Sequence, residues 1–248
     1  MKEHPELSCA LCGTKACASD PEARKFPDFC PMASQCEELS AVAHSYMTDE
    51  DLRRLARESA CTEAAGYCRW TRIEDIMDVA RRMGWTKLGI AHCAGLMTEA
   101  RLAREIFVDN GFEVFTICCK VGSIEKEKVG LTDREKVHPG QFEALCNPVA
   151  QAALLAAAGA QFNVVIGLCV GHDSLFFMHS RVPATVLVAK DRVLGHNPVA
   201  ELTPATPITG GSGQWPTLNP DPEQPGRGAG DRAPPFFRSP NLRVCKIL

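Results

Sequence analysis

The stretch Val164-Val-Ile-Gly-Leu-Cys-Val-Gly-His-Asp-Ser-Leu175 decides the fold class of this chain. Its first half is a short, continuous apolar run, which is typical of a parallel strand that is covered on both faces. Its second half brings a thiol, an imidazole and a carboxylate to the strand's end, at Cys169, His172 and Asp173. Ligands of open α/β sheets bind just outside the carboxyl ends of the strands. The stretch therefore predicts an α/β fold with a candidate site at this strand end.

The alternation of apolar runs and helical periods continues on both sides of that stretch. Three more strands are expected, over residues 88–91, 112–117 and 184–189. Helices are expected between the strands, from about residue 98 to 110, 148 to 159 and 174 to 180. Strands that alternate with helices form a mainly parallel sheet with right-handed crossovers. We therefore predict an α/β domain over residues 85–203, with a four-stranded, mainly parallel sheet and flanking helices in a flavodoxin-like or Rossmann-like three-layer arrangement.

The rest of the sequence divides into three segments. Residues 1–36 are rich in cysteine and proline and too polar to build a core, so a bound metal is expected to hold this module. Residues 37–84 predict a helical hairpin, with capping sequences that begin at Thr48 and Thr71. Residues 204–248 are rich in proline and glycine and show no periodicity, which predicts a disordered tail.

Composition narrows the classes of partner. The chain has 248 residues, a net charge of -3 and 13 cysteines. The charge gives no reason to expect nucleic acid, and no apolar run approaches the roughly 20 residues that span a bilayer, so no membrane is expected. The N-terminal Met-Lys-Glu-His-Pro is not followed by a hydrophobic segment, and we expect a cytoplasmic protein. In that compartment cysteines serve metal binding or catalysis rather than disulfides.

Four cysteines near the N-terminus are spaced like metal ligands, in the pattern Cys9-x2-Cys12-x4-Cys17-x12-Cys30. Four thiolates at such spacing can close a tetrahedral zinc site or hold an iron–sulfur cluster, and the spacing leaves both open. The alternative is a set of free thiols. We expect a metal because a segment without a core needs another source of folding energy.

A second group of cysteines falls at predicted strand ends. Cys93, Cys119 and Cys169 end three different strands, and Cys146 ends a long polar connection over residues 121–146. Neighbouring strands lie about 4.8 Å apart, so these thiols are expected on one rim of the sheet. They could bind a second metal or a cluster there, or carry out redox chemistry. The alternative is packing, because an unpaired cysteine often behaves as a small buried hydrophobe.

Other residues beside these thiols have several possible roles. His172 could be a fourth ligand, a general base beside a thiolate, or a surface histidine. Lys120 could lower the pKa of a thiol or bind an anion. Asp173 is expected to cap the next helix, and Cys68 is a further candidate for the strand-end group. Cys169, His172 and Lys120 are therefore the catalytic candidates if the protein is an enzyme, which the residues leave undecided.

Several short motifs together carry a family resemblance over residues 9 to 200. They are Cys9-Ala-Leu-Cys12 with Ala16-Cys17, Cys30-Pro31, Gly66-Tyr67-Cys68 with Thr71-Arg72, Gly89-Ile-Ala-His-Cys93, Cys119-Lys120, Cys146-Asn-Pro148, Gly167-Leu-Cys-Val-Gly-His-Asp-Ser174, and Lys190-Asp-Arg-Val-Leu194 with His196-Asn-Pro198. The sequence resembles a microbial family of predicted metal-binding proteins, domain-of-unknown-function family 1847. The resemblance implies metal binding through cysteines, without a settled reaction, and supports the four N-terminal cysteines as ligands. The chain departs from the family after about Leu202.

The sequence thus favours a cytoplasmic, cysteine-rich metal-binding protein with zinc or an iron–sulfur cluster at the N-terminal cysteines. Its second candidate site lies at the strand ends. The alternative is an iron–sulfur or thiol-dependent oxidoreductase or transferase that uses the strand-end cysteines. A third hypothesis has zinc in the N-terminal module alone and a small-molecule pocket at the rim. The expected partners are a metal ion or cluster and a small molecule or redox partner.

Overall fold

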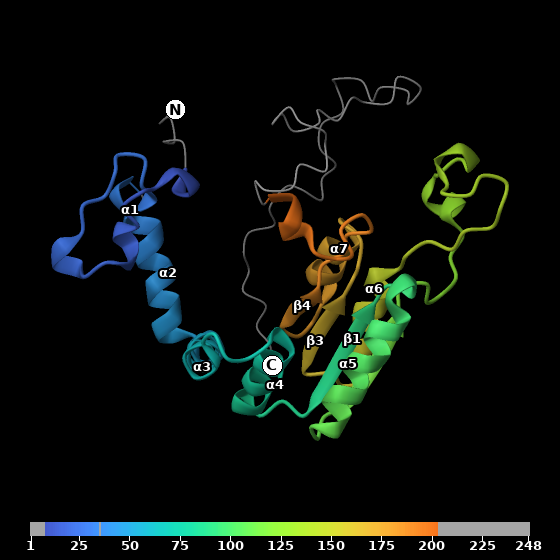
Figure 1. The fold of residues 1–248 in the computed structure, drawn as a ribbon, viewed down its shortest axis with the longest axis horizontal. Helices are drawn as coiled ribbons and strands as arrows, with labels where there is room; N and C mark the ends of the chain where they lie inside the picture. The colour runs from blue at the N-terminus through green and yellow to red at the C-terminus, as the bar shows by residue number, and fades with distance from the viewer. Residues whose placement is uncertain (1–7, 35, 203–248) are drawn as a thin grey trace. The chain divides into compact units, whose positions relative to one another are not determined.

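A computed structural model describes residues 8–34 and 36–202. Its centre is a four-stranded sheet in which every described pairing is parallel (Figure 1). The strands are β1 (Lys87–His92), β2 (Glu113–Cys118), β3 (Phe162–Ile166) and β4 (Ala184–Val188). Their order is β2-β1-β3-β4. The predicted α/β fold with a parallel sheet is confirmed.

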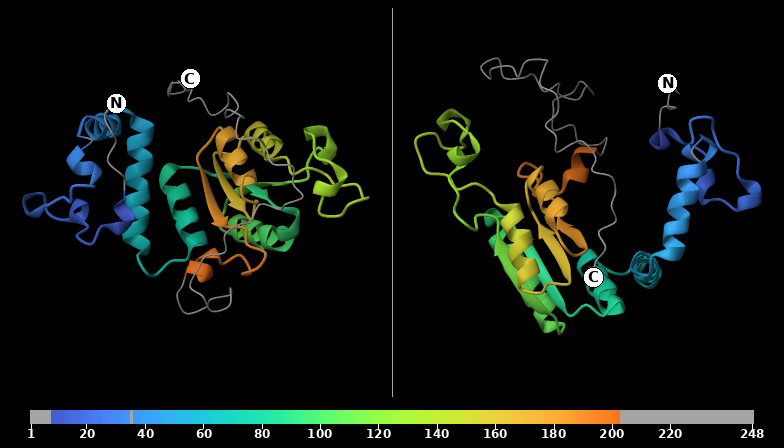
Figure 2. Two further views of the ribbon diagram at one scale, coloured as in Figure 1. Left: turned by 90° about the horizontal axis from the view of Figure 1, so that it is seen from above. Right: turned by 180° about the vertical axis from the view of Figure 1, so that it is seen from behind.

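Helices cover both faces of the sheet. They are α5 (Met97–Asp109), α6 (Pro148–Ala157) and α7 (His172–His179). Both α5 and α6 contact β1 and β2, and they do so from opposite faces, as the two sides of the molecule show (Figures 1 and 2). Helix α7 packs against α6. The three layers follow from right-handed crossovers, because the chain moves in opposite directions along the sheet after β1 and after β2.

The reversal of strand order defines where a ligand would bind. The chain leaves β1 towards α5 on one face, and it leaves β3 towards α7 on the other. A crevice opens at such a topological switch point, outside the carboxyl ends of the two strands. Cys93 directly follows β1, and Cys169 follows β3 by three residues. The stretch over residues 164–175 therefore leads from β3 to the switch point of the sheet.

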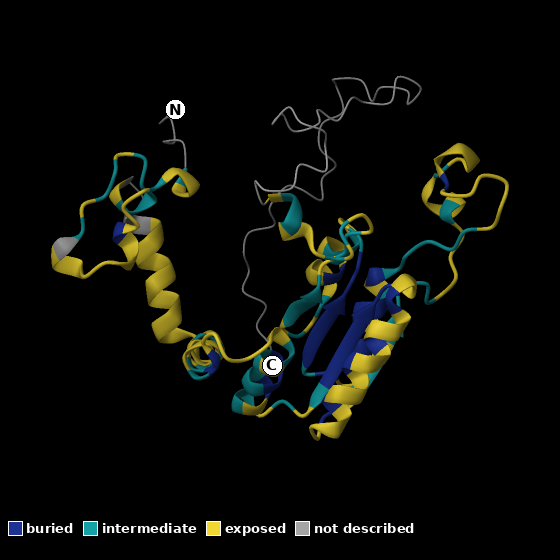
Figure 3. Cartoon of the chain, in the orientation of Figure 1, coloured by how far each residue is buried: buried dark blue, intermediate teal, exposed yellow. Residues whose placement is uncertain are grey.

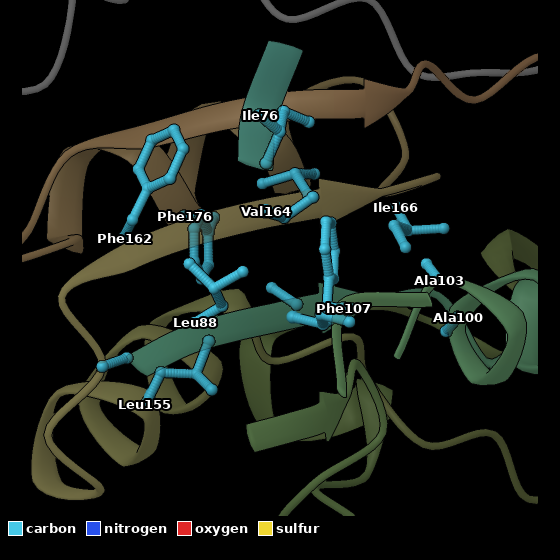
Figure 4. Close-up of a cluster of buried hydrophobic side chains, with 14 of the residues drawn as sticks. Ile76, Leu88, Ala100, Ala103, Phe107, Leu155, Phe162, Val164, Ile166 and Phe176 are labelled. Atoms are coloured by element: carbon cyan, nitrogen blue, oxygen red, sulfur yellow. The ribbon is translucent and has the colours of Figure 1, made fainter. Parts of the chain in front are cut away.

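The core explains why the central strands read as continuous apolar runs. All of β3 and nearly all of β1 are buried, whereas β2 and β4 at the edges are half-buried or exposed (Figure 3). The side chains of Leu88, Val164 and Ile166 are fully buried, in one cluster with Phe107 of α5 and Phe176 of α7, which Figure 4 draws.

The N-terminal part consists of 3₁₀ turns followed by helices. The helices are α1 (Pro31–Ser34), α2 (Cys36–Thr48), α3 (Glu50–Gly66) and α4 (Arg72–Met83). The capping box at Thr71 starts α4 as expected. The expectation that Thr48 caps a helix is wrong, because Thr48 ends α2 and the Asp49 carboxylate accepts the Leu52 N–H at 3.0 Å instead. The hairpin therefore gains a helix on its N-terminal side.

The chain divides into two units, Met1–Pro198 and Val199–Leu248. The described residues of the second unit belong to the 3₁₀ turn Pro198–Leu202, whose first residue is the last residue of the first unit. The tail predicted over residues 204–248 lies outside the described residues. Within the described ranges, no helix is both long and apolar enough to cross a membrane.

Candidate thiol and metal centres

Backbone hydrogen bonds bring three cysteines from separate elements together at the switch point. The Cys93 N–H donates to the Ile166 carbonyl at 3.0 Å, which fixes the end of β1 beside β3. The Cys119 N–H donates to the His92 carbonyl at 2.8 Å, and the Asn147 N–H donates to the Cys119 carbonyl at 2.7 Å. Cys93, Cys119 and Cys146 therefore meet at one rim. We call these three residues the strand-end thiols.

Gln151 of α6 holds this rim in place. Its side chain is fully buried, and its Nε2 donates to the carbonyls of His92 at 3.2 Å and Ile117 at 2.7 Å. It thereby ties together the carboxyl ends of β1 and β2. The sequence analysis missed Gln151, although a glutamine on the apolar face of a predicted helix is a signal, since a buried amide needs partners.

The strand-end thiols are linked through Cys119. The hydrogen bond with Cys119 is the main cause that lowers the pKa of Cys93 to about 4, helped by the Gly95 N–H and Lys190. The hydrogen bond with Cys119 is also the main cause that lowers the pKa of Cys146 to about 5, helped by Lys120. The pKa of Cys119 is raised, because it donates to Cys146 and Cys93. The arrangement therefore favours the thiolate at Cys93 and Cys146 and the thiol at Cys119.

Basic side chains surround these sulfurs. The Lys190 ammonium donates to Cys93 Sγ at 3.2 Å, and the Arg192 guanidinium donates to Cys169 Sγ at 3.1 Å. The hydrogen bond to Cys169 is the main cause that raises the pKa of Arg192, and the charges of Cys93 and Cys146 raise it further. Cys169 thus lies at the same rim as the strand-end thiols.

Lys120 and His172 also act on this rim. Lys120 lies next to Cys119, and its ammonium donates to the Ala144 carbonyl. His172 begins α7, and its charge contributes to the lowered pKa of Cys146. The three catalytic candidates from the sequence are therefore gathered in one place. Lys190 and Arg192, which the sequence analysis did not select, follow β4 and reach the rim by the same strand-end rule.

Cys68, an expected member of this group, is not there, and Asp173 does not have its expected role. Cys68 lies in the turn after α3 with a φ of 55° and lines a cavity of about 510 Å³ with Phe162 and Ala184, at the amino ends of β3 and β4. The expectation that Cys68 joins the strand-end group is therefore wrong. Asp173 does not cap α7, whose N-cap is Gly171, and its carboxylate accepts the neighbouring Ser174 N–H instead.

The N-terminal cysteines form a separate group. Cys9, Cys12, Cys17 and Cys30 line one cavity of about 310 Å³, together with Pro27 and Phe29 among others. The hydrogen bond with the Thr14 hydroxyl, at 3.4 Å, is the main cause that lowers the pKa of Cys12. The four cysteines that were grouped by their spacing in the sequence therefore line one cavity in the structure.

Neither group has the arrangement of a single-ion site. Across residues 8–34 and 36–202, no three His, Cys, Asp or Glu side chains are placed to hold one metal ion. The metal ligands expected from the sequence thus remain a prediction.

The fold and the cysteines together define a cysteine-rich α/β protein with a parallel sheet of four strands. Residues 30–187, more than half of the chain, match the family described as "Protein of unknown function (DUF1847)", and the chain belongs to this family. It is also 36% identical over 191 residues to "Uncharacterized protein MJ0455" of Methanocaldococcus jannaschii, which covers 77% of this chain and 91% of the relative. The strand-end thiols fall inside the family match, whereas Cys9, Cys12 and Cys17 precede it.

Proposed function

We propose that this protein binds an iron–sulfur cluster through Cys9, Cys12, Cys17 and Cys30. The observation that carries the proposal is that all four thiols line the same cavity of about 310 Å³. Thiolates are the ligands of iron–sulfur clusters and of structural zinc. The segment also needs a source of folding energy, since Ala16 is the one buried apolar side chain among those residues of 8–34 whose burial is described.

The size of the cavity favours a cluster over a zinc ion. Zinc binds four thiolates at about 2.3 Å each, so its ligand sulfurs converge and leave no open space between them. Here the four thiols line a cavity of about 310 Å³, which leaves room for a cluster. A cluster supplies electron-transfer chemistry when bound, and the chain supplies the four ligands. The proposal requires that the protein lies in a reducing compartment such as the cytoplasm, where these thiols do not form disulfides.

The test is anaerobic purification of the full chain, followed by a visible spectrum and analysis for iron, acid-labile sulfide and zinc. We expect a brown protein with iron and sulfide in equal amounts. Cys12→Ser and Cys30→Ser should each lose most of the iron, whereas Cys61→Ser within α3 should keep it. A colourless protein with bound zinc would contradict the cluster, and iron that survives both substitutions would contradict the ligand assignment.

A further inference from the structure

We propose that Cys146 and Cys119 form a redox-active dithiol that reduces anionic disulfides of low molecular weight. This activity is independent of the N-terminal cofactor. It rests on the positions of the three sulfurs at the switch point, on their unequal burial, and on the basic side chains around them.

Burial assigns the roles of the thiols. Cys119 is 1% exposed and Cys93 is 8% exposed, so neither is readily reached by a substrate. Cys146 is more exposed, and it comes from the end of the 121–146 connection rather than from a strand. The accessible thiol is therefore the attacking one, and the buried Cys119 beside it resolves the intermediate. Attack requires the thiolate, which the environment of Cys146 favours.

The reaction balances in two exchanges. The Cys146 thiolate attacks one sulfur of the substrate, forms a mixed disulfide, and releases the other half of the substrate as a thiolate. Once Cys146 is in the mixed disulfide, its negative charge no longer raises the pKa of Cys119. The Cys119 thiol then attacks Cys146 Sγ and gives its proton to the half of the substrate that leaves. A Cys119–Cys146 disulfide forms and the second half of the substrate leaves as a thiol. The substrate gains two electrons, the dithiol loses two, and a small thiol reductant restores the dithiol.

The charges around the rim select the class of substrate. The basic groups that act on the thiols are Lys120, Lys190, Arg192 and His172, and the carboxylates of Asp173 and Asp191 lie next to them in the chain. Arg192 is exposed at the rim, where its guanidinium can pair with a carboxylate. A disulfide with carboxylates can form this pair with Arg192, whereas a disulfide with ammonium groups cannot.

The placement of the sulfurs favours this chemistry over a metal centre at the same rim. Hydrogen bonds join Cys119 to both neighbours, and amides donate to the sulfurs, from Ala94 to Cys119 and from Gly95 to Cys93, both at 3.4 Å. Each outer thiolate also has its own lysine ammonium as counter-charge. In the described ranges these sulfurs do not form a convergent ligand set.

The test uses the full chain, reduced and desalted without oxygen, with glutathione disulfide as the probe and cystamine as a cationic control. We expect release of two glutathione molecules per chain and a Cys119–Cys146 disulfide in the peptide map. Cys119→Ser should stop at a mixed disulfide on Cys146, and Cys146→Ser should lose the reaction. Cys118→Ser, the neighbouring thiol at the end of β2, is the matched control and should react like the parent. Cystamine should react at least about tenfold more slowly.

Other outcomes would overturn the proposal. A mixed disulfide that forms first on Cys93 or Cys169 would assign the attack to another thiol. A metal content that falls in Cys119→Ser and Cys146→Ser, but not in Cys118→Ser, would make the rim a metal centre. The pH profile of Cys146 alkylation can be measured in the unmodified chain without any variant. Alkylation confined to alkaline pH would show that Cys146 is not a thiolate at neutral pH.

Discussion

One lysine helps to lower the pKa of each outer thiol at the rim, Lys190 for Cys93 and Lys120 for Cys146. Replacement of Lys120 by Met removes a positive charge that helps to lower the pKa of Cys146. The lowered pKa keeps Cys146 ionised from alkaline pH down to about pH 5. Loss of the lysine should therefore raise the lowest pH at which Cys146 is still ionised. We expect the midpoint of the Cys146 alkylation profile to rise by about one pH unit. Lys128→Met, which removes an exposed lysine paired with Glu125, should leave the midpoint unchanged.

Gly89 in β1 shows how closely the sheet packs on α6. A Cβ at this position would lie 2.3 Å from Asn163 Oδ1 and 3.1 Å from Leu155 Cδ1. Asn163 cannot move freely, because its Nδ2 donates to Ser180 Oγ at 2.9 Å. We expect Gly89→Ala to lower the free energy of unfolding by about 1–3 kcal/mol in urea titrations. Gly13→Ala, where a Cβ would meet no atom within 4 Å, should have no measurable effect on the same transition.

The 121–146 connection is an element held by ion pairs rather than by a core. Lys136 is nearly buried, and its ammonium contacts Glu127 at 2.8 Å and Asp133 at 2.6 Å. Lys126 pairs with Glu143, whose carboxylate also accepts the His138 N–H. The Lys126 hydrogen bond is the main cause that lowers the pKa of Glu143 to about 2. This element, which delivers Cys146 to the rim, should therefore respond to acid.

Acid should destabilise the connection, because the pKa values of its paired carboxyls are lowered. A depressed folded pKa stabilises the connection above the unfolded value, near 4.3 for a glutamate, and this stabilisation is lost as the pH falls towards about 2. Hydrogen exchange of residues 126–143 should show constant protection from pH 7 to about 4.5 and increasing exchange below it. Lys136→Met should weaken this protection at pH 7, because it leaves Glu127 and Asp133 facing each other without a cation. Unchanged protection in this variant would show that the ion pairs do not hold the element.

An element could be predicted from the sequence when the interactions that form it join residues close together in the chain. The strands and the helix start at Asn147-Pro148 follow from neighbouring residues, and the Asn147 carboxamide does accept the Ala150 N–H. The meeting of the strand-end cysteines could be predicted because the end of each parallel strand reaches the same rim. The pairing of Lys190 with Cys93 could not, because these residues lie 97 positions apart and only the complete strand order brings them together.

At the scale of the whole molecule, the two groups of cysteines belong to parts with different sources of stability. The hydrophobic core cluster is built by residues from Ile73 onwards and includes none of the described residues before it. The α/β domain therefore has its own core, which contains the thiols Cys93 and Cys119. Residues 8–34 have short turns and the one-turn helix α1, and Ala16 is their one buried apolar side chain where burial is described, so we expect their order to depend on what the cysteines bind.

This difference predicts that loss of the N-terminal cofactor unfolds one part and spares the other. Cys30→Ser should remove amide protection over residues 8–34 in hydrogen exchange, because the free energy of cofactor binding is also the folding free energy of that segment. The urea transition of the α/β domain, followed by Trp85, which stacks on Phe162 at 4.9 Å, should shift by less than about 0.5 kcal/mol. The Cys146 alkylation profile should also stay in place. If the domain transition and the alkylation profile both move with Cys30→Ser but not with Cys61→Ser, the two centres are coupled through the helices between them.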